Sequence, residues 1–157
     1  MKIHKGALLT IVVLLAGTAM GTAAQGGVEV DKNVTLPVTI EKTWYRTGKV
    51  RLFGKAYEQT GTLTVSDIGV EFTSDKGTVN IPKGSITWVE WGKLSPDIQN
   101  DWAIVRYTDS TGAAIVAFKG ALFAGPDKDN LIFSALMKLM VPKDADSDVP
   151  SEPGIRE

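Results

Sequence analysis

The segment from Gly61 to Trp91 (GTLTVSDIGVEFTSDKGTVNIPKGSITWVEW) constrains the fold of this chain more than any other. Apolar and polar residues alternate in short runs within it, and a period of two is typical of half-buried β-strands. Ser66–Gly69 and Ser74–Gly77, which separate these runs, have the composition of tight turns. Turns this short join antiparallel neighbours. The sequence therefore predicts a three-stranded meander, followed after Pro82 by another strand at Ser85–Trp91.

The alternation also predicts which side chains of this segment face the core. In the meander these are Leu63, Val65, Val70, Phe72, Val79 and Ile81. In the following strand, Ile86 and Trp88 are expected to share one face. A β-bulge after them would offset Val89 and Trp91.

Two more strands are predicted downstream, at Asp101–Tyr107 and Ala113–Lys119, with a turn at Thr108–Gly112 between them. The second of these strands is apolar on both faces, which indicates a central position in the sheet. The preceding segment, Gly92–Asn100, contains Ser95-Pro96-Asp97 and is predicted to be a loop or a single helical turn.

One amphipathic helix is predicted near the C-terminus. Apolar residues between Leu131 and Met140 recur at spacings of three and four, which is the period of a helix. Asp127 is the predicted N-cap, Lys138 lies in the last turn, and Pro142 ends the helix.

Two segments ahead of the meander also alternate. Val34–Ile40 has strand period, and Pro37 within it favours an edge strand or an extended arm. The segment from residue 49 to 55 predicts a further strand, with Lys49, Arg51 and Lys55 on one face.

The first 24 residues have the features of an export signal. Lys2 and Lys5 provide its basic start, and Gly6–Ala24 is a run of 19 uncharged residues. We predict cleavage before Gln25 or one residue earlier, and so a periplasmic or secreted protein. The alternative is an N-terminal membrane anchor, because the uncharged run is long enough to span a bilayer.

The remaining chain divides into three predicted parts. Residues 25–33 are Gly-rich and charged, and are expected to form a flexible lead-in. Residues 34–142 form one domain. Residues 143–157 contain two basic and five acidic residues, and are expected to be a disordered acidic tail.

Composition excludes several classes of chemistry. The chain has no cysteine, and its one histidine, His4, lies in the predicted signal. After cleavage the protein would have no Ser-His-Asp or Cys-His site, no thiol chemistry and none of the usual zinc ligands. Residues 25–157 carry 15 basic and 18 acidic side chains, so a broad nucleic-acid-binding surface is not expected either. We predict no catalytic residues, no metal and no cofactor.

Four groups of residues carry a resemblance to a known family: Gly61-Thr-Leu63-Thr-Val65, Ile68-Gly69-Val70-Glu-Phe72, Ile81-Pro82 followed by Ile86, and the Ile132–Met140 helix. In this order, about seven antiparallel strands and then a helix, the chain resembles the pleckstrin-homology (PH) superfold, closest to GRAM-like and bacterial PH-like domains. The match covers about three-fifths of the chain, roughly residues 49–141. It implies a mainly β fold: a bent, partly open antiparallel barrel capped at one end by the helix. It also implies binding of lipid headgroups, peptides or other domains, and no catalysis.

Two sets of residues are candidates for such a binding site. Lys49, Arg51 and Lys55, with Arg46 close by, would form a cationic face for a phosphate, an acidic partner or anionic lipid; the alternative is an ordinary solvated strand face. The second set would line a ligand surface at the barrel mouth or, alternatively, pack in the core and at its rim. It consists of Trp44, Trp88, Trp91 and Trp102.

We therefore expect an exported, non-catalytic binding or protein-interaction module. Its partner would be a protein or lipid of the cell envelope, with at most peripheral membrane contact. The alternative is a carrier of a small apolar or amphipathic ligand at the barrel mouth. An enzyme of unknown type is the third hypothesis, because few proton-transfer groups remain without His or Cys.

Overall fold

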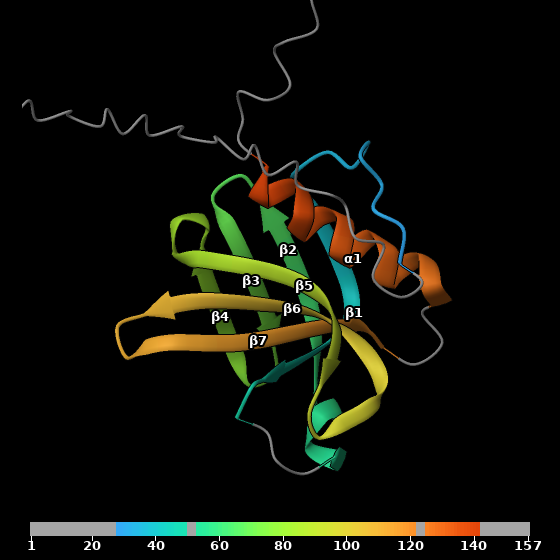
Figure 1. Cartoon of the computed structure of the whole chain (residues 1–157), viewed down its shortest axis with the longest axis vertical. Helices are drawn as coiled ribbons and strands as arrows, with labels where there is room; N and C mark the ends of the chain where they lie inside the picture. Colours follow the sequence, from blue (N-terminus) through green and yellow to red (C-terminus); the bar gives the residue numbers. More distant parts are fainter. Residues whose placement is uncertain (1–27, 50–52, 122–124, 142–157) are drawn as a thin grey trace, which may run out of the picture.

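The computed structural model describes residues 28–49, 53–121 and 125–141, and it confirms a mainly β fold with one C-terminal helix (Figure 1). Seven strands follow one another along the chain: β1 (Val38–Thr47), β2 (Gln59–Ser66), β3 (Gly69–Ser74), β4 (Gly77–Pro82), β5 (Ile86–Leu94), β6 (Asp97–Asp109) and β7 (Gly112–Gly120). The helix α1 (Gly125–Met140) comes last. Two short 3₁₀ helices, η1 (Phe53–Tyr57) and η2 (Lys83–Ser85), precede β2 and β5.

All seven strands belong to one antiparallel sheet with the order β4-β3-β2-β1-β7-β6-β5. β1 lies in the middle, paired with β2 on one side and with β7 on the other. Its register shifts between Ile40 and Thr43, where Lys42 has a positive φ of 52°. Figure 1 shows that the sheet is bent, because β5, β6 and β7 run across β2, β3 and β4. α1 lies across one end of the bent sheet.

The predicted meander is confirmed as β2, β3 and β4. Tight turns join its strands, and Gly69 follows the first turn with a φ of +149°. A Cβ atom at Gly69 would lie 2.3 Å from the carbonyl oxygen of Ile81 on β4. Glycine is therefore required there both for its backbone conformation and for the close approach of the neighbouring strand.

The main core fills the space between the two halves of the sheet and α1. It consists of Val34, Ile40, Tyr45, Leu63, Val65, Val70, Phe72, Ile81, Ile86, Val89, Trp91, Ala103, Val105, Val116, Phe118, Ile132, Ala135, Leu136 and Leu139. The predicted inward residues of the meander are among them, except Val79, which is partly buried against the core. At its centre Tyr45 stacks on Phe72, with ring centroids 4.8 Å apart, and lies 5.7 Å from Phe118. Burial raises the pKa of the Tyr45 hydroxyl to about 12, with a further contribution from Tyr107.

α1 contacts β1, β2, β5, β6 and β7 through its apolar side, as its period predicts. The helix begins at Gly125, so the prediction of Asp127 as N-cap is wrong. Asp127 lies in the first turn, where its negative charge interacts favourably with the positive end of the helix dipole. Asp129 accepts hydrogen bonds from the Gly120 amide (2.7 Å) and from Lys119 Nζ (2.8 Å), which ties the helix to β7. Within the described residues, no helix has the length and apolarity needed to cross a membrane.

The segment ahead of β1 is docked on the helix. The Asp31 amide donates to Ser134 Oγ at 2.8 Å, and Val28 packs against the main core. Of the predicted lead-in at 25–33, the structure describes residues 28–33, which include these two contacts. Of the segment predicted as an edge strand or an extended arm, residues 34–37 precede β1, and Val38–Ile40 pair with β2 alone. β7 pairs with β1 only from Thr43 onward.

Three other local predictions are corrected. The strand predicted at 49–55 is not found in the described part of this segment: β1 ends at Thr47, η1 begins at Phe53, and residues 50–52 lie outside the described residues. The predicted loop at 92–100 is a hairpin, because β5 continues to Leu94 and β6 starts at Asp97. Ile86 and Trp88 do not share a face, because the β-bulge falls between them and leaves Ile86 buried and Trp88 exposed.

Candidate functional site

A second, smaller cluster lies on the face of β1, β6 and β7 that points away from the main core. Its buried members are Trp102 and Ile104 of β6, Ala117 of β7 and Ala56 of η1; Trp44, Tyr57, Leu94 and Ile115 pack around them. The alternation along β6 explains the division, because Ala103 and Val105 face the main core while Trp102 and Ile104 face this outer cluster. η1 covers the outer face of the sheet at this point.

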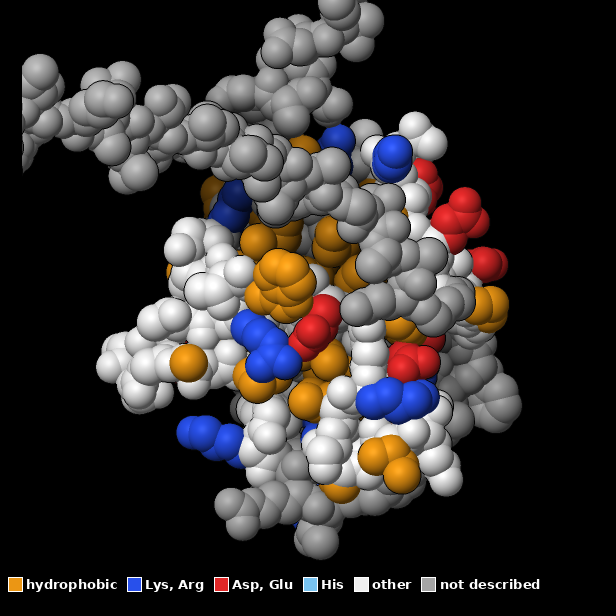
Figure 2. Space-filling view, in the orientation of Figure 1, with side chains coloured by type: hydrophobic (Ala, Val, Ile, Leu, Met, Phe, Trp, Pro, Cys, Tyr) orange, Lys and Arg blue, Asp and Glu red, His pale blue; other side chains and the backbone are white. Residues whose placement is uncertain are grey.

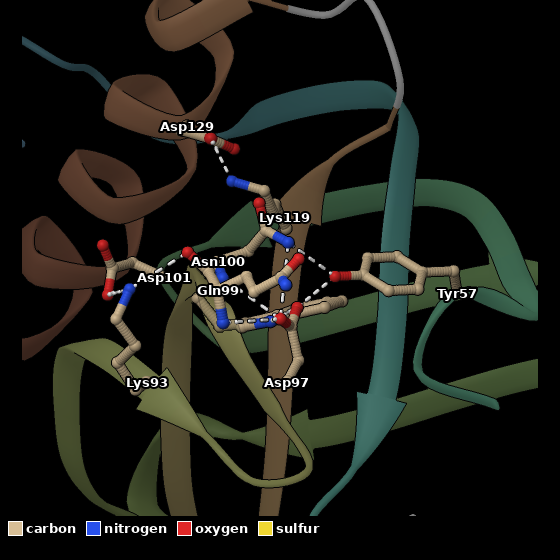
Figure 3. Close-up of polar contacts among 9 residues, drawn as sticks. Tyr57, Lys93, Asp97, Gln99, Asn100, Asp101, Lys119 and Asp129 are labelled. Atoms are coloured by element: carbon tan, nitrogen blue, oxygen red, sulfur yellow. Dashed lines mark hydrogen bonds and ion pairs between the residues drawn. The ribbon is translucent and has the colours of Figure 1, made fainter. Parts of the chain in front are cut away.

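Asp97, the first residue of β6, lies at the edge of the outer cluster with no exposed surface. Its carboxylate accepts hydrogen bonds from the Tyr57 hydroxyl and from Trp102 Nε1, the latter at 3.0 Å (Figure 3). It also accepts from the backbone amides of Gln99 and Asn100, each at 3.1 Å. The Asn100 side-chain amide bridges the group, since its nitrogen donates both to Tyr57 (2.8 Å) and to Asp97 (3.3 Å).

Arg46 of β1 is buried beside this carboxylate, with 1% of its surface exposed. Its guanidinium donates to the carbonyl oxygens of Leu94 (3.0 Å) and Ser95 (2.6 Å). We use the name β5–β6 turn for residues 94–100, which are the end of β5, the two turn residues and the first four residues of β6, where the register with β5 shifts. The guanidinium carbon also lies 5.6 Å from the centre of the Trp102 ring, within the range of a cation–π contact. We call Arg46, Tyr57, Asp97, Asn100 and Trp102 the buried polar cluster.

The environment changes the pKa values of its members. Burial raises the pKa of Asp97, but the hydrogen bonds from Tyr57, Trp102 and the backbone amides outweigh it, and the pKa lies below its usual value. Burial, together with the hydrogen bond to Asp97, raises the pKa of Tyr57 to about 12. Burial lowers the pKa of Arg46, and the charge of Asp97 partly opposes this. The cluster therefore holds a carboxylate, a guanidinium and a neutral phenol at neutral pH.

This arrangement does not favour proton transfer. Both oxygens of Asp97 accept hydrogen bonds from the protein, and the side chain is closed to solvent. A general base must reach a substrate proton within hydrogen-bond distance, and Asp97 presents no surface for that contact. Among the described residues there is also no group of three or more His, Cys, Asp or Glu side chains placed to hold a metal. The cluster is best explained as a device that fixes backbone conformation.

The predicted basic residues are not brought together on one strand. Arg46 is buried in the polar cluster, Lys49 lies in the turn after β1, and Lys55 lies on η1, where it forms an ion pair with Glu58 (2.6 Å). Arg51 is outside the described residues. The three described members of the predicted cationic face therefore lie on three different segments.

The four tryptophans do not gather around one cavity. Trp91 belongs to the main core and contacts Phe133 of α1, with ring centroids 5.9 Å apart. Trp102 is on the opposite side of the sheet, and Trp44 reaches the same outer cluster through Tyr57 (4.6 Å between centroids). Trp88 stands apart on β5 with 56% of its surface exposed. Packing explains the first three, and Trp88 remains a surface candidate.

Trp88 lies beside an ion pair on the outer face of the β5–β6 hairpin. Its cross-strand neighbour is Arg106, which donates to Glu90 Oε1 from Nε (3.1 Å) and from Nη2 (2.7 Å). Two other apolar side chains are exposed at or near turns: Ile68, between β2 and β3, is 84% exposed, and Ile98, the second residue of β6, is 74% exposed. Figure 2 shows hydrophobic side chains exposed beside charged ones on the face where β5 lies in front.

Sequence reasoning missed Asp97 and Tyr57 as members of a cluster. A local signal existed, because an Asp after Pro with an Asn three residues later is typical of a turn whose side chain accepts backbone amides. No local signal predicts the contacts of Tyr57 and Arg46 with the hairpin. These residues lie some 40 positions or more before it in the sequence, and the pairing of the strands brings them beside it.

The findings define the class of protein by architecture: a seven-stranded antiparallel sheet followed by a C-terminal helix that packs on it. A scan against protein-family models finds no match to the chain, and a comparison with curated proteins finds no significant similarity.

Proposed function

We propose that this protein is an exported binding or protein-interaction module with a PH-like fold, and that it does not catalyse a reaction. The strand order supports the PH-like assignment, since a meander of four strands (β1–β4) and a meander of three (β5–β7) are joined through the β1–β7 pair, and α1 covers one end. Such an arrangement is a rigid scaffold that presents turns and an outer sheet face.

The observation that carries the proposal is the exposure of Trp88 beside the Arg106–Glu90 pair. Tryptophan and arginine are enriched at the energetic centres of protein interfaces, because each combines a large apolar surface with a polar group. A protein partner in the cell envelope therefore fits this face. The near-neutral charge of the chain argues against nucleic acid.

The carrier hypothesis is less well supported. A carrier would need the tryptophans around one cavity, whereas Trp91 and Trp102 lie on opposite sides of the sheet and are packed against protein side chains. Membrane contact, if the partner is a lipid, would be peripheral.

Native mass spectrometry of the protein purified from its own cell envelope tests the proposal. We expect the wild type to carry a second protein in a defined complex. Trp88→Ser should lose most of that complex while keeping its far-UV circular dichroism spectrum. Thr87→Ser, one residue away on the same strand, is the matched control and should keep the complex. An empty wild-type monomer would contradict the proposal, and a bound lipid in place of a protein would favour the carrier.

A further inference from the structure

The β5–β6 turn is held by side chains to a degree that the neighbouring turns are not. Arg46 fixes the carbonyls of Leu94 and Ser95, and Asp97 fixes the amides of Gln99 and Asn100. Lys93 Nζ donates to the Gln99 carbonyl at 3.1 Å. The backbone from Leu94 to Asn100 is therefore hydrogen-bonded to the charged side chains of Arg46, Lys93 and Asp97.

The other hairpins show that strands in this protein can be joined more simply. The β2–β3, β3–β4 and β6–β7 turns are short and each is followed by a glycine with positive φ: Gly69, Gly77 and Gly112. The side chains that form hydrogen bonds within those turns belong to Ser66, Ser74, Asp109 and Thr111, none of which is buried. Burying an Arg and an Asp carries a desolvation penalty, and well-packed apolar residues in place of such a pair often give a protein that is equally stable or more stable. Their presence at this turn is better explained by a need for one conformation.

What this conformation presents is Ile98. It follows the fully buried Asp97 directly and has 74% of its surface exposed. Because the backbone around Ile98 is already held, little backbone conformational entropy is lost when this side chain binds, so even a small apolar contact contributes to affinity.

The charges near the turn indicate what kind of partner fits. Lys93 is paired with Asp101 (3.2 Å), and Lys55 of η1 is paired with Glu58 (2.6 Å). Because these cations already face carboxylates, the turn has no concentration of positive charge for a phosphate or an anionic bilayer. One aliphatic side chain is also too small to hold a protein on a membrane surface, but it is suited to an apolar pocket.

We propose that the β5–β6 turn is a preorganised recognition turn, in which Ile98 inserts into an apolar pocket of a protein partner. This inference rests on the proposed function, of which it names a second contact point, separate from Trp88. The buried polar cluster acts in it only by positioning the turn.

The binding experiment compares two exposed isoleucines on two turns. Immobilised wild type, Ile98→Ser and Ile68→Ser are exposed to detergent-free protein extract of the source cell's envelope, and binding is followed by biolayer interferometry. Loss of a buried isoleucine contact should weaken Ile98→Ser by about 10- to 100-fold. Ile68→Ser should bind like the wild type, and prior protease digestion of the extract should abolish the signal. Vesicles of phosphatidylethanolamine and phosphatidylglycerol should not bind.

The outcomes separate this inference from the proposed function. If Ile98→Ser and wild type bind equally, the recognition turn is wrong and the module stands. If the signal survives digestion of the extract, or if vesicles bind through Ile98, the partner is a lipid surface and the inference fails. If the wild type binds nothing, the inference and the proposed function both fail.

Amide hydrogen exchange tests the preorganisation without any partner. In the free wild type, the Gln99 and Asn100 amides should exchange at least about 10-fold more slowly than in Asp97→Ala, which removes their acceptor. Their rates in Ile98→Ser should match those of the wild type. Equal rates in wild type and Asp97→Ala would show that the turn is not held by Asp97, and would overturn the proposal.

Discussion

The two sides of β1, β6 and β7 are stabilised in different ways. On the inner side, aromatic and aliphatic residues from both halves of the sheet pack with α1, and the buried side chains are almost all apolar. On the outer side, a much smaller apolar cluster surrounds a carboxylate and a guanidinium that are both closed to solvent. The inner side buries far more surface, whereas the outer side contains more specific contacts.

This difference shows how one sheet can supply both stability and a defined surface. Apolar burial is non-directional, so the main core stabilises the fold without fixing any particular turn. Hydrogen bonds to charged groups are directional, and here they end on the backbone of the β5–β6 turn. We therefore expect changes on the two sides to differ in kind as well as in size.

The largest effect is expected from Asp97→Ala. It leaves the Arg46 guanidinium buried without a nearby carboxylate, and it leaves the Tyr57 and Trp102 donors without their acceptor. Removing one member of a buried charged group typically costs about 3–5 kcal/mol. Urea unfolding monitored by circular dichroism measures it. A loss below about 1 kcal/mol would show that water takes over the role of the carboxylate and that the outer side is not closed.

A similar or slightly smaller loss is expected from Leu136→Ala in the main core. Leu136 is fully buried on α1, and truncating such a leucine costs about 2–5 kcal/mol. The same urea titration applies, and exchange at Gln99 should stay slow because the turn is held from the other side of the sheet. A change below about 0.5 kcal/mol would mean that the helix is not docked.

A further contrast between the two sides is expected in acid. The pKa of Asp97 is held below its usual value, so the unfolded chain takes up a proton more readily than the folded one. The charged Asp97 therefore adds to the free energy of unfolding above about pH 4, and this contribution is lost as the pH falls through the lower pKa of the folded state. The stability of Asp97→Asn should therefore fall less between pH 5 and pH 2.5 than that of the wild type.

Urea midpoints across this pH range provide the measurement. Asp109 also has a lowered pKa, through its hydrogen bonds with Thr111, and so Asp109→Asn is the control for a carboxylate that is exposed. Parallel curves for wild type and Asp97→Asn would contradict the assignment of a charged Asp97.

The smallest effect is expected from Glu90→Gln on the exposed surface. Its ion pair with Arg106 is partly solvated, and such pairs contribute about 0–1 kcal/mol. Thermal unfolding in low and high salt provides the check, with Lys55→Gln as a second exposed pair. A loss of more than about 2 kcal/mol in the free energy of unfolding would show that this exposed pair stabilises the fold as strongly as a buried one, which would contradict the prediction.

Much of the inner side could be predicted from the sequence, because its signals are local. The turns around Gly69 and Gly77 and the alternation of Leu63 and Val65 define the meander, and the three- and four-residue spacing up to Met140 defines the helix. The bulge in β5 could be predicted but not its position, since a shift of one residue decides whether a side chain faces inward.

The outer side could not be predicted, because it is made by contacts between distant segments. Alternation at 49–55 indicates a strand, yet its last described residues belong to η1, whose Ala56 packs in one cluster with Trp102 and Ile104. Arginine is usually a surface residue, and Arg46 is buried here because β1 places it beside the β5–β6 turn.

A double-mutant cycle of Arg46→Met and Asp97→Asn tests the central claim most directly, namely that the two buried charges act together to hold the turn. Each single change leaves one charge on the outer side without the other, whereas the double change removes both. We predict that the double variant loses at least about 1 kcal/mol less free energy of unfolding than the sum of the single losses, as expected for residues in one network. Additive losses, within about 0.3 kcal/mol, would contradict the account.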